Sequence, residues 1–410
     1  MSVAWQGHGA AAMQAVAFQW HKTVFEGAMV KNASNLFCVL LLVLVAACTA
    51  VKHDPVPEAL LGSVRVAGLE NLRTWADEFS GDSDLLTRQY AEAIRKHVET
   101  NGRKLDFLTL SGGGQSGAYG AGLLNGWTAS GRRPQFEIVT GVSTGAIIAP
   151  FAFLGSEYDP VLKEIYTTTR TQDIGTVNLA GAGLLNVSGF ESLLKKYVTP
   201  QLLAEIARES STGRILLVGT TNLEAERGVI WNLSALAQSD YPGKADLFRK
   251  IIQASASIPG AFPPVSIAVD HGGQQFEELH VDGGVTEQVF IYPPNVTIRK
   301  LERALGYALK KRVFVVRNTK LDASYKPLKA ATVKIVERSL NTLIRNQGLS
   351  DVRRIYDIAE RDGIAFHRTS IPGTFNGKSK GFFDPEYMQP LFDLGYRDGL
   401  DPAVWERSRP

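Results

Sequence analysis

The sequence is poor in residue types that would indicate several common classes of protein. It has only two cysteines, Cys38 and Cys48, both near the N-terminus, which excludes a disulfide framework or a multi-cysteine metal site in the main body. The net charge of +3 is small and no Lys/Arg-rich block occurs, so we expect no nucleic-acid partner. With 44% hydrophobic and 21% charged residues, the composition is typical of a globular protein with one large core.

One apolar run near the N-terminus carries a targeting signal. Residues 36–47 (LFCVLLLVLVAA) are uncharged; they fall far short of the ~20 residues of a membrane-spanning helix but suit the h-region of a signal peptide, with Lys31 as its n-region charge. The tetrapeptide VAAC that ends at Cys48 resembles the lipobox of bacterial lipoproteins, in which the cysteine is acylated and becomes the first residue of the mature chain. We favour it over a signal peptide with an incidental cysteine, or a buried helix, because Cys48 falls where the run ends.

We also expect translation to begin at Met29. Residues 1–28 make a poor n-region because they are long and contain two tryptophans and a glutamate, whereas MVKNASNLFC is a compact basic start. A peptide from residues 1–28 detected in cells would contradict this hypothesis. Acylated Cys48 would anchor the chain in the cell envelope, and the outer membrane is favoured in a species with two membranes because Thr49, not aspartate, follows the cysteine.

Beyond the signal segment (1–48), the pattern predicts an α/β fold. Residues 49–62 contain two prolines and are typical of a tether, and the charge spacing over 66–99 predicts helix. Apolar strands alternate with helices after that. The predicted strands are 105–110, 136–140, 214–223, 229–233, one ending at 282, and 312–318. The predicted helices are 117–127, 146–154, 248–257, a long helix or helical pair over 330–362, and a tail over 382–399. This alternation favours a largely parallel sheet. We expect a tether and N-terminal helices over 49–100, a main domain over 101–320 and a mainly helical C-terminal extension over 321–410.

The pentapeptide GVSTG, residues 141–145, is the first candidate for a catalytic site. It follows a predicted strand and precedes a predicted helix, which is the context of the G-x-S-x-G nucleophile elbow. Gly141 and Gly145 permit a sharp turn that exposes the Ser143 hydroxyl, and the N-terminus of the next helix favours developing negative charge. Glycine and serine are common, so the pentapeptide alone is also compatible with a chance match.

Three consecutive glycines, Gly112–Gly114, follow the strand 105–110 and lead into a helix of small residues. Acyl transfer needs backbone N–H donors aimed at an oxyanion, and one such donor is worth about 3–4 kcal/mol. A phosphate cradle is the alternative, since Gly117 completes a G-x-G-x-x-G pattern, but no G-K-[ST] lysine follows and no acidic partner lies about 20 residues on in a suitable strand. We favour the oxyanion hole, and attribute the small residues of the helix to close helix–sheet packing.

The serine needs a base, and the histidines are poorly placed to supply it. In α/β-hydrolases the order is Ser, Asp/Glu, His. Three histidines follow the serine, and only His367 also follows Asp282, in a strand-like setting without a loop signal. Asp282 lies at a strand end before two glycines, so its carboxylate could act as the base of a two-residue arrangement if its proton affinity is raised. The D-G-G sequence is also compatible with a simple turn.

The three motifs together resemble the patatin-like phospholipase family. The glycine loop, the G-x-S-x-G turn and D-G-G occur in this order, with 30 residues from Gly113 to Ser143, and ASASIPGAFPP (254–264) is similar to the family's segment between serine and aspartate. The resemblance covers residues 105–285. It implies a three-layer fold with a mostly parallel central sheet, helices on both faces and C-terminal helices.

The resemblance also implies a Ser–Asp dyad in place of a triad. Ser143 would be the nucleophile and Asp282 the base, with the amides of Gly113 and Gly114, and in addition Gly112 and Gln115, as the oxyanion hole. The family often has Arg or Lys two residues after the third glycine, where this chain has Ser116. That departure weakens the expectation of a phospholipid head-group preference but not of ester hydrolysis.

We therefore expect a membrane-anchored serine acyl-ester hydrolase that acts on lipids (phospholipase A type), with no metal or cofactor. An esterase or thioesterase for small soluble acyl substrates is one alternative, which Ser116 favours and the lipid anchor disfavours. A non-catalytic envelope lipoprotein that binds lipid or protein is another, which the intact Ser143 and Asp282 disfavour. Candidates for a lipid entrance are 291–293, 382–383 and Trp405, although ordinary packing also explains each of them.

Overall fold

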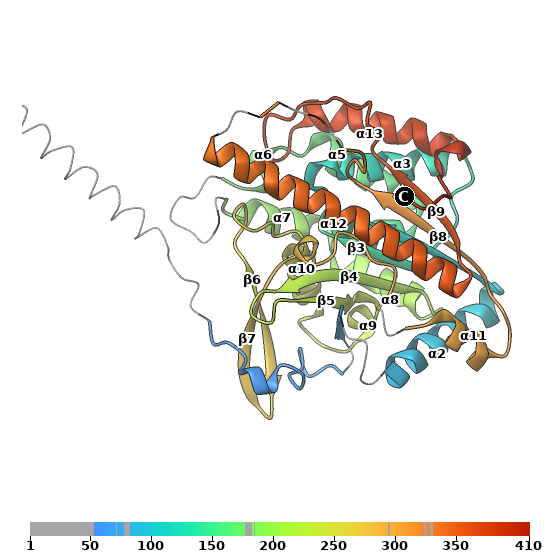
Figure 1. The fold of residues 1–410 in the computed structure, drawn as a ribbon. Helices are drawn as coiled ribbons and strands as arrows, with labels where there is room; N and C mark the ends of the chain where they lie inside the picture. Colours follow the sequence, from blue (N-terminus) through green and yellow to red (C-terminus); the bar gives the residue numbers. More distant parts are fainter. Residues whose placement is uncertain are drawn as a thin grey trace, which may run out of the picture. The chain divides into compact units, whose positions relative to one another are not determined.

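A nine-stranded sheet organises the chain (Figure 1). The computed structural model describes residues 53–70, 72–77, 83–176, 183, 185–293, 296–323, 325, 327–328 and 331–410; the predicted signal segment and Cys48 lie outside them. The strands are β1 (Arg73–Trp75), β2 (Lys104–Leu110), β3 (Ile138–Val142), β4 (Ile215–Asn222), β5 (Arg227–Asn232), β6 (Val265–His271), β7 (Gln274–Asp282), β8 (Lys310–Arg317) and β9 (Ala365–Ser370).

The centre of the sheet is parallel, as the sequence predicted. Strands β4, β3, β2, β8 and β9 pair in that order and all in parallel, so their carboxyl ends meet at one edge. On the other side of β4 the pairing is antiparallel, through β5 to β1 and through β7 to β6. Strand β7 therefore brings its last residue, Asp282, beside Thr220 of β4.

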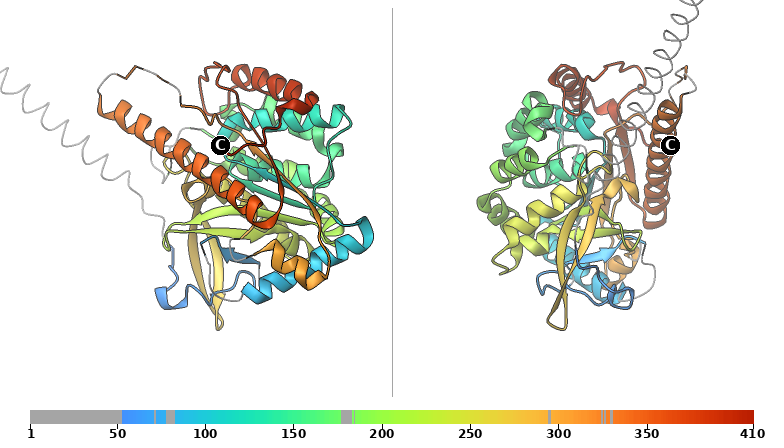
Figure 2. Two further views of the ribbon diagram at one scale, coloured as in Figure 1. Left: turned by 45° about the vertical axis from the view of Figure 1, so that its right-hand side comes forward. Right: turned by 90° about the vertical axis from the view of Figure 1, so that its left-hand side faces the viewer.

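Helices cover both faces of the sheet (Figure 2). They are α2 (Ser83–Asn101), α3 (Gly117–Ala129), α4 (Thr144–Leu154), α5 (Asp159–Thr168), α6 (Thr171–Ile174), α7 (Ser188–Tyr197), α8 (Pro200–Ser210), α9 (Leu233–Gln238), α10 (Lys244–Ser255), α11 (Ile298–Leu305), α12 (Thr332–Asp362) and α13 (Pro385–Leu400). None of them, within the described residues, is long and apolar enough to cross a membrane.

Two cores lie on opposite faces because side chains alternate along each strand. In β2, Leu108 and Leu110 join the core under α3, α4 and α10, whereas Leu105 and Phe107 join the core under α2, α11 and α12. The right-hand view of Figure 2 shows α12, in orange-brown, on one side of the strands and the green helices on the other. The α/β fold with three layers is thus as predicted.

The helix predicted over 66–99 is wrong in its first half. Residues 73–75 form β1, antiparallel to β5, and helix α2 begins only at Ser83. Arg73 donates to the buried Glu278 (Nη2 to Oε1, 2.8 Å), and its guanidinium lies over the ring of Trp231. These partners are far away in the sequence, so the local charge spacing gave no sign of a strand.

The boundary predicted at residue 320 does not separate two units. Strand β9 extends the same sheet, and all described residues belong to one contact unit. Helix α13 packs directly on α3: a Cβ on Gly122 would collide with the backbone of Phe392, and a Cβ on Gly395 with that of Tyr119. The small residues of α3 therefore serve close helix–helix packing, and not only packing against the sheet.

Candidate active site

Ser143 occupies a strained turn between β3 and α4. Its backbone has φ 56° and ψ −123°, a left-handed conformation that residues other than glycine rarely adopt and that is characteristic of nucleophile elbows. Its N–H donates to Ser255 Oγ (3.0 Å), whose hydroxyl donates to the carbonyl of Gly219 in β4 (2.6 Å). The turn is thus held in place by the neighbouring strand.

Both glycines of the elbow are required by close backbone contacts. A Cβ on Gly141 would collide with the backbone of Gly145, and a Cβ on Gly145 with that of Leu110 at the end of β2. The strand and the helix of the elbow therefore approach each other, and β2, more closely than any side chain allows. This agrees with the role predicted for the two glycines.

Asp282 is buried at the end of β7 and interacts with Ser143. Its Oδ1 accepts the Gly284 N–H (2.7 Å), whereas Oδ2 is buried and has no hydrogen-bond partner of good geometry in the described residues. Burial raises the pKa of Asp282 from its usual 3.8 to about 6, and the Ser143 hydroxyl and the Gly284 N–H oppose this rise. The carboxylate therefore has a pKa close to neutrality and one oxygen available to receive a proton.

The glycine loop lies directly beside the serine. A Cβ on Gly112 would stand 3.2 Å from the Cβ of Ser143. The Gly112 N–H donates to the Gln288 carbonyl (3.0 Å), so this amide is engaged and is not available to an oxyanion in this structure. The N–H groups of Gly113, Gly114 and Gln115 have no hydrogen-bond acceptor among the described residues. These three amides are the candidate donors of the oxyanion hole.

Asn318, which the sequence analysis did not single out, clamps this loop. Its N–H donates to Ser111 Oγ and its Nδ2 to the Ser111 carbonyl, both at 2.8 Å, and its Oδ1 accepts the Gly120 N–H (3.1 Å). Asn318 follows β8, the neighbour of β2 in the sheet. A polar residue at the very end of a predicted parallel strand is the signal that could have indicated it.

Gln288 is a second residue that the sequence analysis missed. Its carbonyl accepts the Gly112 N–H, its Nε2 donates to the Gly284 carbonyl (2.6 Å), and its own N–H donates to Asp351 Oδ2 (2.7 Å). One residue therefore joins the oxyanion loop to the turn that carries Asp282. Its place six residues after Asp282 in a loop gave no local signal of this role.

Gly113→Ala is expected to lower kcat by about 10²–10³-fold, the loss seen when one oxyanion donor is removed. The added Cβ would stand 2.8 Å from the Asn318 Cβ and closer still to the Asn318 carbonyl, so the loop must move away from its clamp. Initial rates on an ester substrate measure the effect. Gly62→Ala is the control, because its Cβ would have open space; equal rates for the two variants would contradict the prediction.

Ser116, in the position where the family often has a basic residue, ties the loop to the C-terminal part of the chain. Its hydroxyl forms a hydrogen bond with the Tyr387 hydroxyl (2.9 Å). Gln115 next to it donates to Ser379 Oγ (2.7 Å) and accepts the Asp384 N–H (3.0 Å). Polar contacts to residues 379–387 thus hold the outer side of the loop.

The histidines are engaged away from the serine. His280 is buried, with hydrogen bonds to Thr220 Oγ1 (3.0 Å) and Glu278 Oε2 (3.1 Å). His367 stacks on Phe314. Asp282 is thus the candidate for the group that accepts the Ser143 proton.

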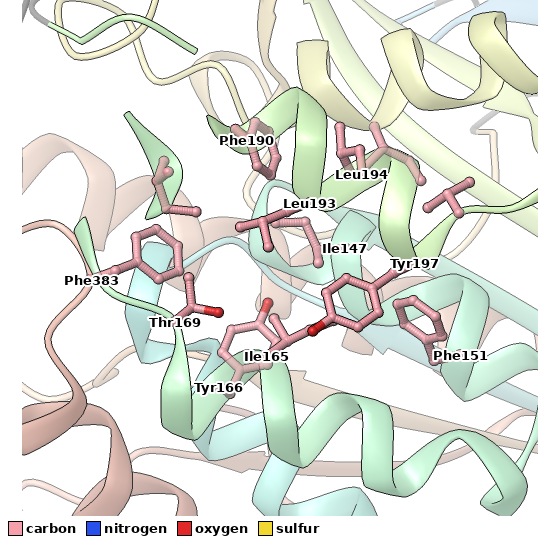
Figure 3. A pocket seen from close by; sticks show the side chains of 13 residues that line it. Ile147, Phe151, Ile165, Tyr166, Thr169, Phe190, Leu193, Leu194, Tyr197 and Phe383 are labelled. Atoms are coloured by element: carbon pink, nitrogen blue, oxygen red, sulfur yellow. The ribbon is translucent and has the colours of Figure 1, made fainter. Parts of the chain in front are cut away.

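Two apolar pockets lie at the serine and beside it. The first is lined by Gly114, Ser143 and Thr144 and by apolar side chains. The second is shown in Figure 3. Both are lined by Ile147, Ile174, Phe190 and Phe383, and Figure 3 shows Phe190, Leu193 and Phe383 pointing into the second one.

Of the predicted entrance residues, only 382–383 lie at these pockets. Phe383 lines both of them, and the exposed Phe382 packs against Phe262, which lines the first. Ile291 and Tyr292 are buried in the core on the opposite face of the sheet, and Trp405 packs on Trp127. Ordinary packing therefore explains the other candidates.

Comparison with known proteins identifies the family. Residues 108–294 match the model of the family described as patatin-like phospholipase. This stretch is a patatin-like phospholipase domain. It contains the glycine loop, Ser143 and Asp282, as the resemblance predicted, and the family supports hydrolysis of lipid esters. No curated protein matches the chain.

Two solved structures are distantly similar to this chain. VipD from Legionella pneumophila has 11% identity and a TM-score of 0.33, over 72% of this chain and 67% of that chain. The human GIVD cytosolic phospholipase A2 has 10% identity and a TM-score of 0.34, over 82% and 66%. This chain thus spans about two thirds of their lengths. Because both TM-scores are low, the family assignment rests on residues 108–294.

Proposed function

We propose that this chain is a serine acyl-ester hydrolase of lipids, of phospholipase A type, that acts through a Ser143–Asp282 dyad. The observation that carries the proposal is the buried carboxylate of Asp282 near the serine of a strained elbow, with one oxygen that has no hydrogen-bond partner among the described residues. Burial raises the pKa of this carboxyl to about 6. Unengaged loop amides and an apolar pocket at the same serine support it. The patatin-like family supplies the reaction class.

The reaction proceeds in two halves at one site. As Ser143 Oγ attacks the ester carbonyl carbon, Asp282 Oδ2 takes the hydroxyl proton, and the loop amides hold the tetrahedral oxyanion. The intermediate collapses, the C–O bond of the ester breaks, and the proton on Asp282 passes to the leaving alcohol. Water then attacks the acyl-serine, Asp282 takes its proton, and Ser143 recovers a proton as the fatty acid leaves.

The pockets favour a long acyl chain over a small polar acyl group. Hydrophobic side chains dominate the lining of both spaces, and Ile147, Ile174, Phe190 and Phe383 line both of them. Burial of each CH₂ of an acyl chain contributes about 0.8 kcal/mol. A soluble short-chain ester would leave the second pocket unused. An esterase for small soluble substrates is therefore the second candidate, and only Ser116 supports it.

Product analysis with vesicles tests this proposal. The full chain is incubated with vesicles of a diacyl phosphatidylcholine, and in parallel with a short soluble acyl ester, and the products are separated by mass spectrometry. Release of free fatty acid and lysophospholipid supports the lipid hydrolase. Cleavage of the soluble ester alone would favour the esterase, and cleavage of neither by well-folded protein would favour the non-catalytic lipoprotein.

We propose in addition that acylated Cys48 anchors the chain in the cell envelope of a bacterium. The apolar run of residues 36–47 and the VAAC sequence support this. Incorporation of an alkyne-labelled fatty acid that is lost in Cys48→Ser would support the anchor, and labelling that persists would contradict it.

A further inference from the structure

The first half of helix α12 stands clear of the protein body. Its second half is packed, with Val352, Ile355 and Ala359 buried in the core. In contrast, the residues from 332 to 346 whose side chains are described are exposed, apart from the half-buried Arg338 and Arg345. Figures 1 and 2 show this end of the orange helix extending past the strands.

The projecting half is amphipathic. Five large apolar side chains are exposed to solvent there: Ile335 46%, Val336 51%, Leu340 54%, Leu343 65% and Ile344 44%. At about 100° per residue, these positions fall on one side of the helix. The opposite side holds Lys334, Arg338, Asn341 and Arg345, and Glu337 is the one acidic residue from 332 to 350. An apolar face opposite a basic face is the pattern of helices that lie in a membrane interface.

The apolar face is not a continuation of the packed face. Gly348 sits against the guanidinium of Arg317, and with Val352 and Ile355 it defines the side of α12 that meets the sheet. Followed toward the N-terminus, that side reaches Asn341 and Lys334, whereas the apolar face is turned from it by about a third of a turn. The exposed apolar side chains of the first half of α12 therefore do not extend the face of the helix that packs on the sheet.

The topology places this half at the active-site edge of the sheet. Helix α12 connects the parallel strands β8 and β9, so it begins beyond their carboxyl ends, where Ser143 and the glycine loop also lie. Its Gly348 contacts Arg317, the last residue of β8, so the residues before it overhang that edge. Ile258, which lines the pocket at Ser143, is exposed at the same edge.

We propose that the first half of α12 lies on the surface of a lipid bilayer with anionic head groups and holds the Ser143 pocket at that surface. This inference rests on the proposed function, since a lipid hydrolase must work at such an interface. The apolar face enters the head-group boundary, and the basic side chains attract the anionic lipids. Neither a second copy of the chain nor another protein is needed to cover the face.

Hydrogen exchange resolved to peptides tests the contact directly. The full chain is measured alone, with vesicles of phosphatidylcholine, and with vesicles of phosphatidylcholine and phosphatidylglycerol. We expect the amides of 332–347 to exchange at least about fivefold more slowly with the anionic vesicles, and less so with the neutral ones. Binding of the vesicle through another segment would not give this result, because the exchange is measured on the amides of α12 itself.

A matched pair of variants tests the consequence for activity. Leu340→Gln/Leu343→Gln/Ile344→Gln removes the apolar face, and Asn341→Gln/Thr342→Gln/Asn346→Gln is the control on exposed polar positions. We expect the first to lower hydrolysis of anionic vesicles by about tenfold and to leave cleavage of a soluble ester within about twofold. The control should match the parent chain in both assays.

The outcomes separate this inference from the proposed function. If no substrate is cleaved, the proposed function fails, while the exchange experiment still decides the membrane contact. If exchange at 332–347 is unchanged by anionic vesicles, or if the two triple variants behave alike, the inference is overturned. Protection of 332–347 that rises with protein concentration in the absence of vesicles would assign the face to a second copy and overturn it as well.

Discussion

Ser143→Ala is expected to lower kcat/KM for ester hydrolysis by about 10⁵-fold or more, as removal of the nucleophile does in serine hydrolases. The elbow holds Ser143 at φ 56°, beside the glycine loop, where a Cβ on Gly112 would stand 3.9 Å from its Oγ. A fluorophosphonate probe followed by peptide mass spectrometry is the direct measurement. The parent chain should carry the adduct on Ser143, and the variant should carry none.

The control for this experiment is Ser211→Ala, an exposed serine at the end of α8, which should keep full labelling and full activity. The Ser143 variant should fold as the parent does, since alanine meets the same backbone constraint as serine. Activity that survives in Ser143→Ala, or an adduct on another serine, would remove Ser143 from the mechanism. The role of Asp282 would then have no support.

The candidate reacting groups could be named from the sequence because each lies at a strand end that glycine marks. Gly112–Gly114, Gly141 and Gly145 and the D-G-G turn are local signals, and the structure brings all three turns together. Asp282 was preferred to a histidine because no histidine was well placed after Ser143, and the family resemblance then implied the dyad. The structure now gives it a physical reason, because His280 is committed to Thr220 and Glu278.

The residues that hold these groups could not be predicted, because they come from distant parts of the chain. Asn318 contacts the glycine loop because β8 lies next to β2 in the sheet. Ser255, at the end of α10, contacts the elbow. Strand β1 was mistaken for helix because its stabilising partner, Glu278, lies on β7. Sheet order decides each of these contacts, and a local pattern contains no information on sheet order.

Helix α12 in the C-terminal part also shows what a local sequence pattern cannot predict. The helical pattern of 330–362 predicted α12. It did not predict that the second half of this helix packs against the core while the first half extends past the sheet. Its apolar residues would be assigned to a core by periodicity alone. Only the packing of Gly348 on Arg317 shows which side of the helix faces the sheet, and that the apolar side faces elsewhere.

Asp282→Asn is expected to lower kcat/KM by about 10⁴-fold, since the amide cannot take the Ser143 proton. In the parent chain the ionised form is the active one. Because the pKa of Asp282 is raised to about 6, kcat/KM should fall about tenfold per pH unit below 6 and level off above it. The residual rate of the variant should lack this step, and a pH profile of both proteins measures it.

The same substitution should stabilise the fold, which a purely structural aspartate would not do. A folded-state pKa raised from 3.8 to about 6 means that the native state binds the proton more tightly than the unfolded state. Ionised Asp282 therefore costs up to about 3 kcal/mol of unfolding free energy above pH 6, and this cost vanishes as the pH falls below 3.8. Asparagine keeps the oxygen that accepts the Gly284 N–H and carries no charge.

Thermal unfolding at pH 8 and at pH 4 measures this difference. Asp282→Asn should melt at a higher temperature than the parent chain at pH 8, and the gap should close toward pH 4. Asp393→Asn, on the exposed side of α13, is the control and should change neither activity nor stability. A variant at 282 that loses both activity and stability would show that Asp282 holds the fold together, and would remove the evidence that its burial prepares it as a base.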